Sequence, residues 1–98
     1  MNALNLEIKD NQLLRQFESQ TDKGRMILEY AIQERKMFLT KLNHPENESD
    51  EIINFFIENI LNIAQERKLK VVPTHPKVVG MFRKNPVFRE MLPPGIKL

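Results

Sequence analysis

Hydrophobic and polar residues alternate along the first half of the chain, which is the pattern of strands with one buried face. Leu4, Leu6 and Ile8 alternate with polar neighbours, residues 13–19 show a weaker strand pattern, and alternation returns at residues 26–32. Residues 37–42 are expected to form a fourth strand. Asp10–Asn11 and the segment around Gly24 carry turn-forming residues between these runs. The pattern therefore predicts an antiparallel meander of four strands, at residues 4–8, 13–19, 26–32 and 37–42.

The periodicity changes after the fourth predicted strand. A polar stretch, residues 43–51, is followed by apolar residues at helical spacing from Ile52 to Ala64. Ser49 or Asn47 is expected to cap this helix, because a short side-chain oxygen can accept a hydrogen bond from the free N–H groups of a helix start. The acidic residues of the stretch suit the positive end of the helix dipole, and this role explains their number without a metal site.

Three shorter elements follow the helix. Residues 69–72 form an apolar run that Pro73 ends, which predicts a strand. A second helix is expected after Pro76, and a last turn or short helix after Pro86. The fold class is therefore α/β (α+β): a meander, a helix, a strand parallel to its predecessor through a right-handed crossover, and a C-terminal helix. The loop at residues 43–53 then lies between a strand and a helix, where phosphates often bind.

Composition limits the chain to one domain and excludes several classes of protein. Ninety-eight residues, 41% of them hydrophobic, suit one modest core within a single domain over residues 1–98. The lack of cysteine excludes disulfides and thiolate nucleophiles, and with only two histidines no metal site is expected. No apolar run approaches the ~20 residues of a membrane span and no signal-peptide pattern is visible, so we expect a cytoplasmic protein without membrane contact.

Charge is distributed unevenly along the chain. Residues 1–67 carry 8 basic and 12 acidic side chains, whereas residues 68–98 carry 7 basic side chains against Glu90 alone. This asymmetry indicates either an anionic partner for the C-terminal third or an ordinary solvated surface. A nucleic acid is the less favoured partner, because the aromatic residues of this region, Phe82 and Phe88, lie in apolar patterns typical of a core.

Four segments together resemble one family: Gly24–Tyr30 (GRMILEY), Ile57–Ala64 (IENILNIA), Leu69–Pro73 (LKVVP) and Asn85–Phe88 (NPVF). In their order and spacing they are similar to the short, single-domain GNAT-type N-acetyltransferases, over almost the whole chain. The resemblance implies a GNAT-like fold and acetyl-CoA-dependent transfer of an acetyl group to an amine, with backbone N–H groups stabilising the oxyanion. It implies a CoA-type ligand and an amine acceptor as partners. A monomer or a homodimer paired through an exposed sheet edge is expected.

The differences from the family pattern lie in its functional segments. The family's pyrophosphate loop, Arg-Gly-x-Gly-Ile-Gly/Ala, corresponds here to residues 48–53, Glu-Ser-Asp-Glu-Ile-Ile. Glycines let backbone N–H groups approach phosphates closely, whereas acidic side chains repel them. His75 stands where the family has cysteine, and Asn85 and Phe88 replace a histidine and a tyrosine. The alternative function is therefore a catalytically inactive GNAT-like protein that serves as a binding or interaction module.

Two histidines are the candidate catalytic residues. His75 would act as an acid or base near the thiolate and His44 as a base near the acceptor, because histidine titrates close to neutral pH. The alternative for both is an exposed loop histidine. The resemblance places the second helix beside the CoA groove, so its basic residues would replace the charge that the loop lacks, unless they form a solvated face. The candidate CoA-binding residues are Ser49, Asn54, Lys77, Arg83 and Lys84.

Overall fold

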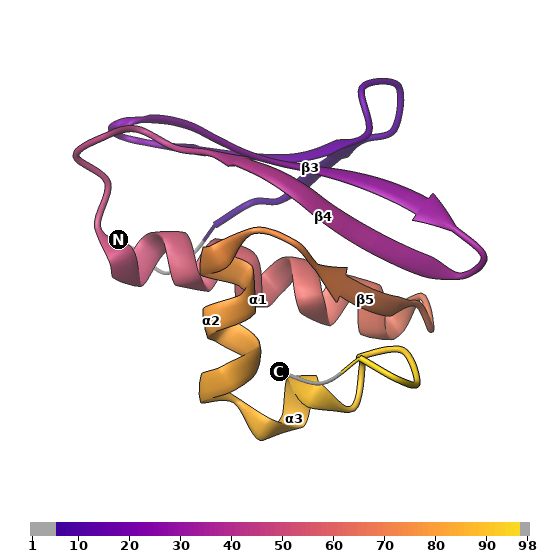
Figure 1. Cartoon of the computed structure of the whole chain (residues 1–98). Helices are drawn as coiled ribbons and strands as arrows, with labels where there is room; N and C mark the ends of the chain where they lie inside the picture. The colour runs from indigo at the N-terminus through magenta and orange to yellow at the C-terminus, as the bar shows by residue number, and fades with distance from the viewer. Residues whose placement is uncertain (1–5, 97–98) are drawn as a thin grey trace.

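A computed structural model describes residues 6–96 of the chain. Over these residues the protein has an α+β fold, with a mixed five-stranded sheet and three helices (Figure 1). In chain order the elements are β1 (Lys9–Asn11), β2 (Gln16–Thr21), β3 (Gly24–Gln33), β4 (Lys36–Asn43), α1 (Asp50–Glu66), β5 (Lys70–Pro73), α2 (Pro76–Lys84) and α3 (Pro86–Arg89).

The sheet has the strand order β1-β2-β3-β4-β5. Its first four strands are antiparallel neighbours, and β5 returns parallel to β4 after the crossover through α1. This confirms the predicted meander followed by a helix and a parallel strand. α1, α2 and α3 all lie on one side of the sheet (Figure 1), so the molecule consists of two layers.

The strand predicted at residues 4–8 is wrong over residues 6–8, the part of it that the structure describes. Residues 6–8 are irregular, and residues 4 and 5 lie outside the described part of the chain. β1 instead covers the three residues that follow, where the sequence predicts a turn. Asp10 is held in this strand because its carboxylate accepts a hydrogen bond from Tyr30 Oη (2.6 Å). The position of β1 therefore depends on a contact between residues far apart in the sequence.

The turn between β1 and β2 occupies the beginning of the second predicted strand. Leu13 and Leu14 lie in this turn with 92% and 61% of their surface exposed, so the prediction that they belong to a strand is wrong. Asn11 sets the turn, because its side-chain oxygen accepts a hydrogen bond from the Leu14 N–H (3.1 Å). Arg15 completes the turn with a φ of 55°, which residues other than glycine rarely adopt.

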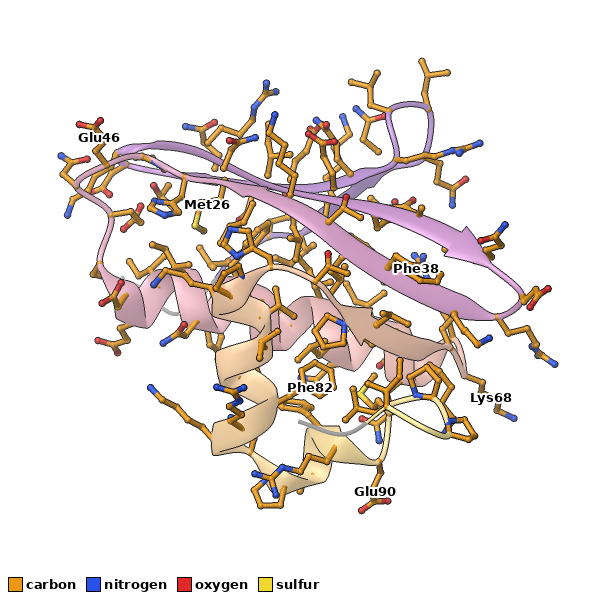
Figure 2. The ribbon with its side chains drawn as sticks, viewed as in Figure 1. Met26, Phe38, Glu46, Lys68, Phe82 and Glu90 are labelled. Carbon is orange, nitrogen blue, oxygen red and sulfur yellow. The ribbon has the colours of Figure 1, made fainter. Side chains whose placement is uncertain are left out.

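The core lies between the sheet and the helices. β2 to β5 contribute alternate side chains to it, and α1 contributes one face, as the two periodicities predict. Met26 points from β3 toward α1, and Phe82 of α2 fills the space beside α3 (Figure 2). The largest fully buried side chains are Phe17, Met26, Leu28, Met37, Leu39, Ile53, Phe56, Ile57, Ile60, Leu61, Val71 and Phe82.

The loop before α1 is anchored to the β2–β3 hairpin. Gly24 has a φ of 143° and lies so close to the loop that a Cβ at this position would be 3.0 Å from Pro45 Cγ. Lys23 Nζ donates a hydrogen bond to the Asn47 carbonyl (3.1 Å). α1 begins two residues earlier than the apolar spacing predicts, and Ser49 is its N-cap, which confirms that prediction.

β4 contains a bulge at the point where it stops pairing with β5. Glu29 on β3 faces Lys41, whereas the next residue, Tyr30, faces Leu39, so Thr40 is an extra residue in β4. A bulge bends its strand and increases the local twist. β5 pairs with β4 only as far as Leu39. Beyond the bulge, the edge of β4 that faces β5 has no strand partner among the described residues.

Candidate functional site

A cavity of about 240 Å³ opens between α1 and α2, the two helices that follow β4 and β5. Its walls come from the first turns of α1 and from one face of α2. Gly80 keeps the α2 side open, because no heavy atom lies within 4 Å of the position that its Cβ would occupy. The residues lining the cavity are Asp50, Asn54, Lys77, Gly80, Met81 and Lys84.

Three of the candidate CoA-binding residues meet in this cavity, namely Asn54, Lys77 and Lys84. Ser49 lies one residue before α1, where its Oγ accepts a hydrogen bond from the Ile52 N–H (3.3 Å). Arg83 does not line the cavity. It is exposed on α2, and its carbonyl accepts a hydrogen bond from an arginine side chain of α3 (2.8 Å). The structure therefore brings together the candidates on α1 and α2 but places Arg83 apart from them.

An ion pair joins the two helices at this cavity. Lys77 Nζ lies 2.9 Å from Asp50 Oδ1. This hydrogen bond and the charge of Lys77 hold the pKa of Asp50 below its usual range, and His44 and Lys84 contribute in the same direction. Because Asp50 neutralises Lys77, the net positive charge of the cavity comes from Lys84.

In the loop before α1, the Glu48 carboxylate accepts a hydrogen bond from a backbone N–H of the same loop. Glu48 is buried, and its Oε2 accepts a hydrogen bond from the Ser49 N–H (3.2 Å). Its Oε1 accepts a hydrogen bond from Thr21 Oγ1 (2.5 Å). The Ile52 N–H is already bonded to the Ser49 side chain. An anion at this helix start would therefore compete with a buried carboxylate for backbone donors.

His75 is the N-cap of α2. Its Nδ1 accepts a hydrogen bond from the Lys77 N–H (3.2 Å). Because a backbone N–H can only donate, a neutral His75 carries its proton on Nε2. The ring is half-buried, so His75 is not the exposed loop histidine of the alternative interpretation. In this tautomer the imidazole can donate a hydrogen bond from its Nε2–H.

His44 adopts the opposite tautomer. Its Nδ1 lies 2.8 Å from the Pro45 carbonyl oxygen, which can only accept a hydrogen bond. Nδ1 therefore carries the proton, and the Nε2 lone pair of the neutral ring is free to accept one. The ring is half-buried at the end of β4. This state suits the predicted role of a base.

The two histidines lie just after the ends of the two strands that separate. His44 follows β4 directly, and His75 follows β5 after Thr74. The Thr74 N–H and hydroxyl both donate to the Leu39 carbonyl, at 3.4 and 2.8 Å. These bonds fix the point at which the strands diverge. A histidine that can accept a proton follows β4, and a histidine that can donate a hydrogen bond follows β5.

Asp50, Gly80 and Met81 line the cavity but were not predicted as site residues. The sequence assigns Asp50 to the capping of α1, and nothing local shows that it pairs with a lysine of another helix. Gly80 did carry a signal, because a glycine inside an amphipathic helix often marks a place where a neighbour approaches or a wall stays open.

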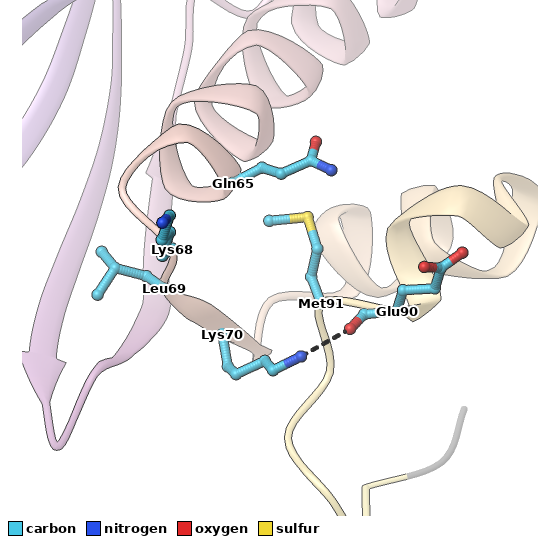
Figure 3. A pocket seen from close by; sticks show the side chains of 6 residues that line it. All are labelled: Gln65, Lys68, Leu69, Lys70, Glu90 and Met91. Carbon is cyan, nitrogen blue, oxygen red and sulfur yellow. Dashed lines mark hydrogen bonds between the residues drawn. The ribbon is translucent and has the colours of Figure 1, made fainter.

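A larger cavity, of about 360 Å³, lies near the opposite end of α1 (Figure 3). Lys70 Nζ donates a hydrogen bond to the Glu90 carbonyl there (3.0 Å), and the Val71 N–H donates to the Met91 carbonyl (2.9 Å). The segment after α3 thus covers the outer edge of β5. None of the candidate site residues lines this cavity, which is bounded by Gln65, Lys68, Leu69, Lys70, Glu90 and Met91.

Residues 6–96 contain no group of three or more His, Cys, Asp or Glu side chains that could hold a metal ion. No helix within this range combines the length and the apolar character that crossing a membrane requires. Comparison with known proteins finds no family model and no curated protein that matches the chain. The function of the site is therefore inferred from its own geometry and from the sequence resemblance.

Proposed function

We propose that this protein binds a CoA-type ligand where β4 and β5 separate, and that it transfers the acetyl group of acetyl-CoA to an amine, as a GNAT-like enzyme. The separation at the Thr40 bulge is the observation that carries this proposal. A free strand edge offers N–H and C=O groups that are not paired. These suit the amide-bearing arm of CoA, which would lie along residues 40–43 as an added strand does.

The side chains around the gap supply the charge and the proton transfers that the reaction needs. Lys84 would attract the phosphates, together with Lys77 once it leaves Asp50. Acetyl-CoA supplies the thioester. As the amine nitrogen forms a bond to the acetyl carbon and the C–S bond breaks, His44 Nε2 accepts the proton that the amine loses. His75 Nε2–H donates a hydrogen bond that stabilises the departing CoA thiolate, which takes its proton from water, and His44 releases its proton to water.

A second candidate function, a binding module without catalysis, is favoured by the loop before α1. The Glu48 carboxylate occupies the Ser49 N–H, and Asp50 occupies Lys77. Each negative charge at partly screened range opposes the binding of a diphosphate by about 1 kcal/mol or less. Several such charges together would prevent CoA from binding, although an extended ligand without phosphates could still pair with the edge of β4.

Titration calorimetry with acetyl-CoA and with CoA tests the proposed ligand. We expect a micromolar dissociation constant that rises about tenfold in Lys84→Ala, because a charge-assisted contact is lost. Lys68→Ala is the matched control, since Lys68 is an exposed lysine just beyond the opposite end of α1 (Figure 2). Absence of binding at millimolar CoA would refute a CoA site and favour the binding module.

Catalysis needs a separate test, which the absence of cysteine simplifies. Because the chain has no thiol of its own, a thiol reagent reports only the CoA that is released from acetyl-CoA. We expect amine-dependent thiol release that falls in His44→Gln and in His75→Asn. CoA binding without thiol release across a panel of primary amines would instead identify an inactive member of this fold.

A further inference from the structure

A basic cavity lies at the end of α1 opposite the candidate site. Its volume is about 310 Å³. The 17 residues of α1 rise about 25 Å, which separates this cavity from the histidines and lysines described above. The turn after β1, the end of β3 and the C-cap of α1 form its walls. The residues lining the cavity are Gln12, Arg15, Tyr30, Ile32 and Arg67.

Arg67, the C-cap of α1, is held in a fixed position. Its Nη2 lies 2.8 Å from Asp10 Oδ2, and its guanidinium carbon lies 5.9 Å from the centre of the Phe17 ring. The side chain keeps 39% of its surface exposed. Asp10 Oδ2 receives no hydrogen bond, so the ion pair does not align an N–H of Arg67 with it. Nη2 is paired with Asp10, and the exposed part of the guanidinium leaves its other N–H donors available to a ligand.

Arg15 reaches the same cavity from a constrained turn. Its φ of 55° is maintained by a hydrogen bond from the Tyr30 N–H to its carbonyl (2.9 Å). Such backbone conformations persist only where the surrounding structure enforces them, and they concentrate at functional sites. Over residues 6–96, no carboxylate lies within ion-pair distance of Arg15.

The charges around the cavity would be balanced by a single negative charge. Arg15 and Arg67 are positive, and Asp10 is negative. Burial, and then the hydrogen bond to Asp10, raise the pKa of Tyr30 to about 12, so its hydroxyl is neutral. One carboxylate therefore neutralises the site, whereas a dianion would be repelled by Asp10.

Ile32 gives the cavity an apolar wall. It lies near the end of β3 with 47% of its surface exposed, although most large hydrophobic residues of the chain are buried. An exposed apolar side chain next to two arginines suits a ligand that has a charged group at one end and an apolar body beside it.

We propose that this cavity binds a carboxylate carried on an apolar group, with the carboxylate between Arg15 and Arg67 and the apolar part against Ile32. A planar guanidinium matches the two oxygens of a carboxylate, and the Gln12 amide would add a further donor. The same chemistry is found in free carboxylic acids and in the C-terminus of a peptide whose last residue is apolar. This site does not depend on the function proposed for the opposite end of the molecule.

An NMR titration that follows the Ile32 methyl groups tests the proposal. N-acetyl-leucine is expected to cause saturable shifts at millimolar concentrations or below. N-acetyl-leucinamide should bind about tenfold more weakly, because it lacks the charge. A tripeptide ending in leucine distinguishes the two sources: tighter binding than that of N-acetyl-leucine assigns the site to chain termini, and equal or weaker binding assigns it to small acids. Inorganic phosphate serves as the dianionic probe.

Variants locate the contacts and provide a matched control. Arg15→Gln and Arg67→Lys, which keeps the charge but loses the planar group, should each weaken binding about tenfold. Arg35→Gln should not, although Arg35 is also an exposed turn arginine with a positive φ (63°). The proposal is wrong if the Ile32 methyl groups do not shift, if the amide or phosphate binds as well as N-acetyl-leucine, or if Arg35→Gln weakens binding as much as Arg15→Gln.

Discussion

Removing one hydroxyl, in Tyr30→Phe, tests how far the contacts at the end of α1 stabilise the fold. Tyr30 is buried, its ring lies 4.8 Å from that of Phe17 between centroids, and its Oη donates to Asp10 at 2.6 Å. The substitution keeps the ring and removes the donor. A hydrogen bond to a charged group contributes about 1.5–3 kcal/mol, so the free energy of unfolding should fall by about 2 kcal/mol at neutral pH.

The phenol of Tyr30 also makes the stability depend on pH in the alkaline range. Burial, followed by the hydrogen bond to Asp10, raises the pKa of Tyr30 from 10.0 to about 12. Because the phenol of the unfolded chain ionises first, the stabilisation from the neutral hydroxyl is complete below pH 10.0 and is lost as the pH rises through about 12. This shift corresponds to about 2.7 kcal/mol of pH-dependent stability, of which burial of the phenol is the largest cause and the hydrogen bond the second.

Urea unfolding of the wild type and Tyr30→Phe across this pH range is the assay. The lysines titrate in both proteins, so the difference between the two free energies isolates the phenol. Tyr30 is the single tyrosine of a chain without tryptophan, and phenolate absorbance therefore reports its ionisation directly. A phenol that titrates near its ordinary pKa in the folded protein would refute the reasoning. So would a difference in stability that stays constant between pH 8 and about pH 12.

Three other substitutions test the cap, the hairpin contact and the ion pair. Ser49→Ala should lower the free energy of unfolding by about 1 kcal/mol in urea, and an unchanged value would show that the cap is dispensable. Gly24→Ala should lower the free energy of unfolding by about 1–3 kcal/mol, because φ is 143° and the new Cβ would lie 3.0 Å from a proline ring. Gly95→Ala should lower it less, because Gly95 has a φ of 90° but open space around its Cβ position. Equal losses for the two variants would contradict the steric part of this reasoning. Asp50→Asn frees Lys77 and should tighten CoA binding about fivefold in calorimetry, and equal or weaker affinity would contradict the proposed role of the pair.

The elements with strong local signals were predictable from the sequence. The apolar spacing and the Ser49 cap define α1, and the turn signal at Gly24 precedes a strand of clear alternation. The N-terminal elements were not predictable in the same way. Leu13 and Leu14 are apolar residues that suggest a buried strand, but they lie exposed in a turn. Local alternation cannot show that Tyr30 holds Asp10 in β1, because their contact spans 20 positions.

The residues of the candidate site were easier to predict than its electrostatics. Asn54 and Lys77 meet because α1 and α2 each follow one of the two strands that diverge. The Asp50–Lys77 pair and the contact between Glu48 and its threonine partner each join residues 27 positions apart. No periodicity in the sequence encodes such pairs, so the acidic residues could be assigned only to capping.

The bulge at Thr40 makes the opening of the sheet depend on one residue. Leu39 and Leu42 lie on the core side of the bulge, and Lys41 between them faces away, so deleting Thr40 would leave this inside–outside order unchanged. β4 would then run straight, and Thr74 could continue the pairing of β5 before α2 begins. One inserted residue would therefore set how far β4 and β5 stay paired. The length of that pairing could then change without any change in the residues of the hydrophobic core.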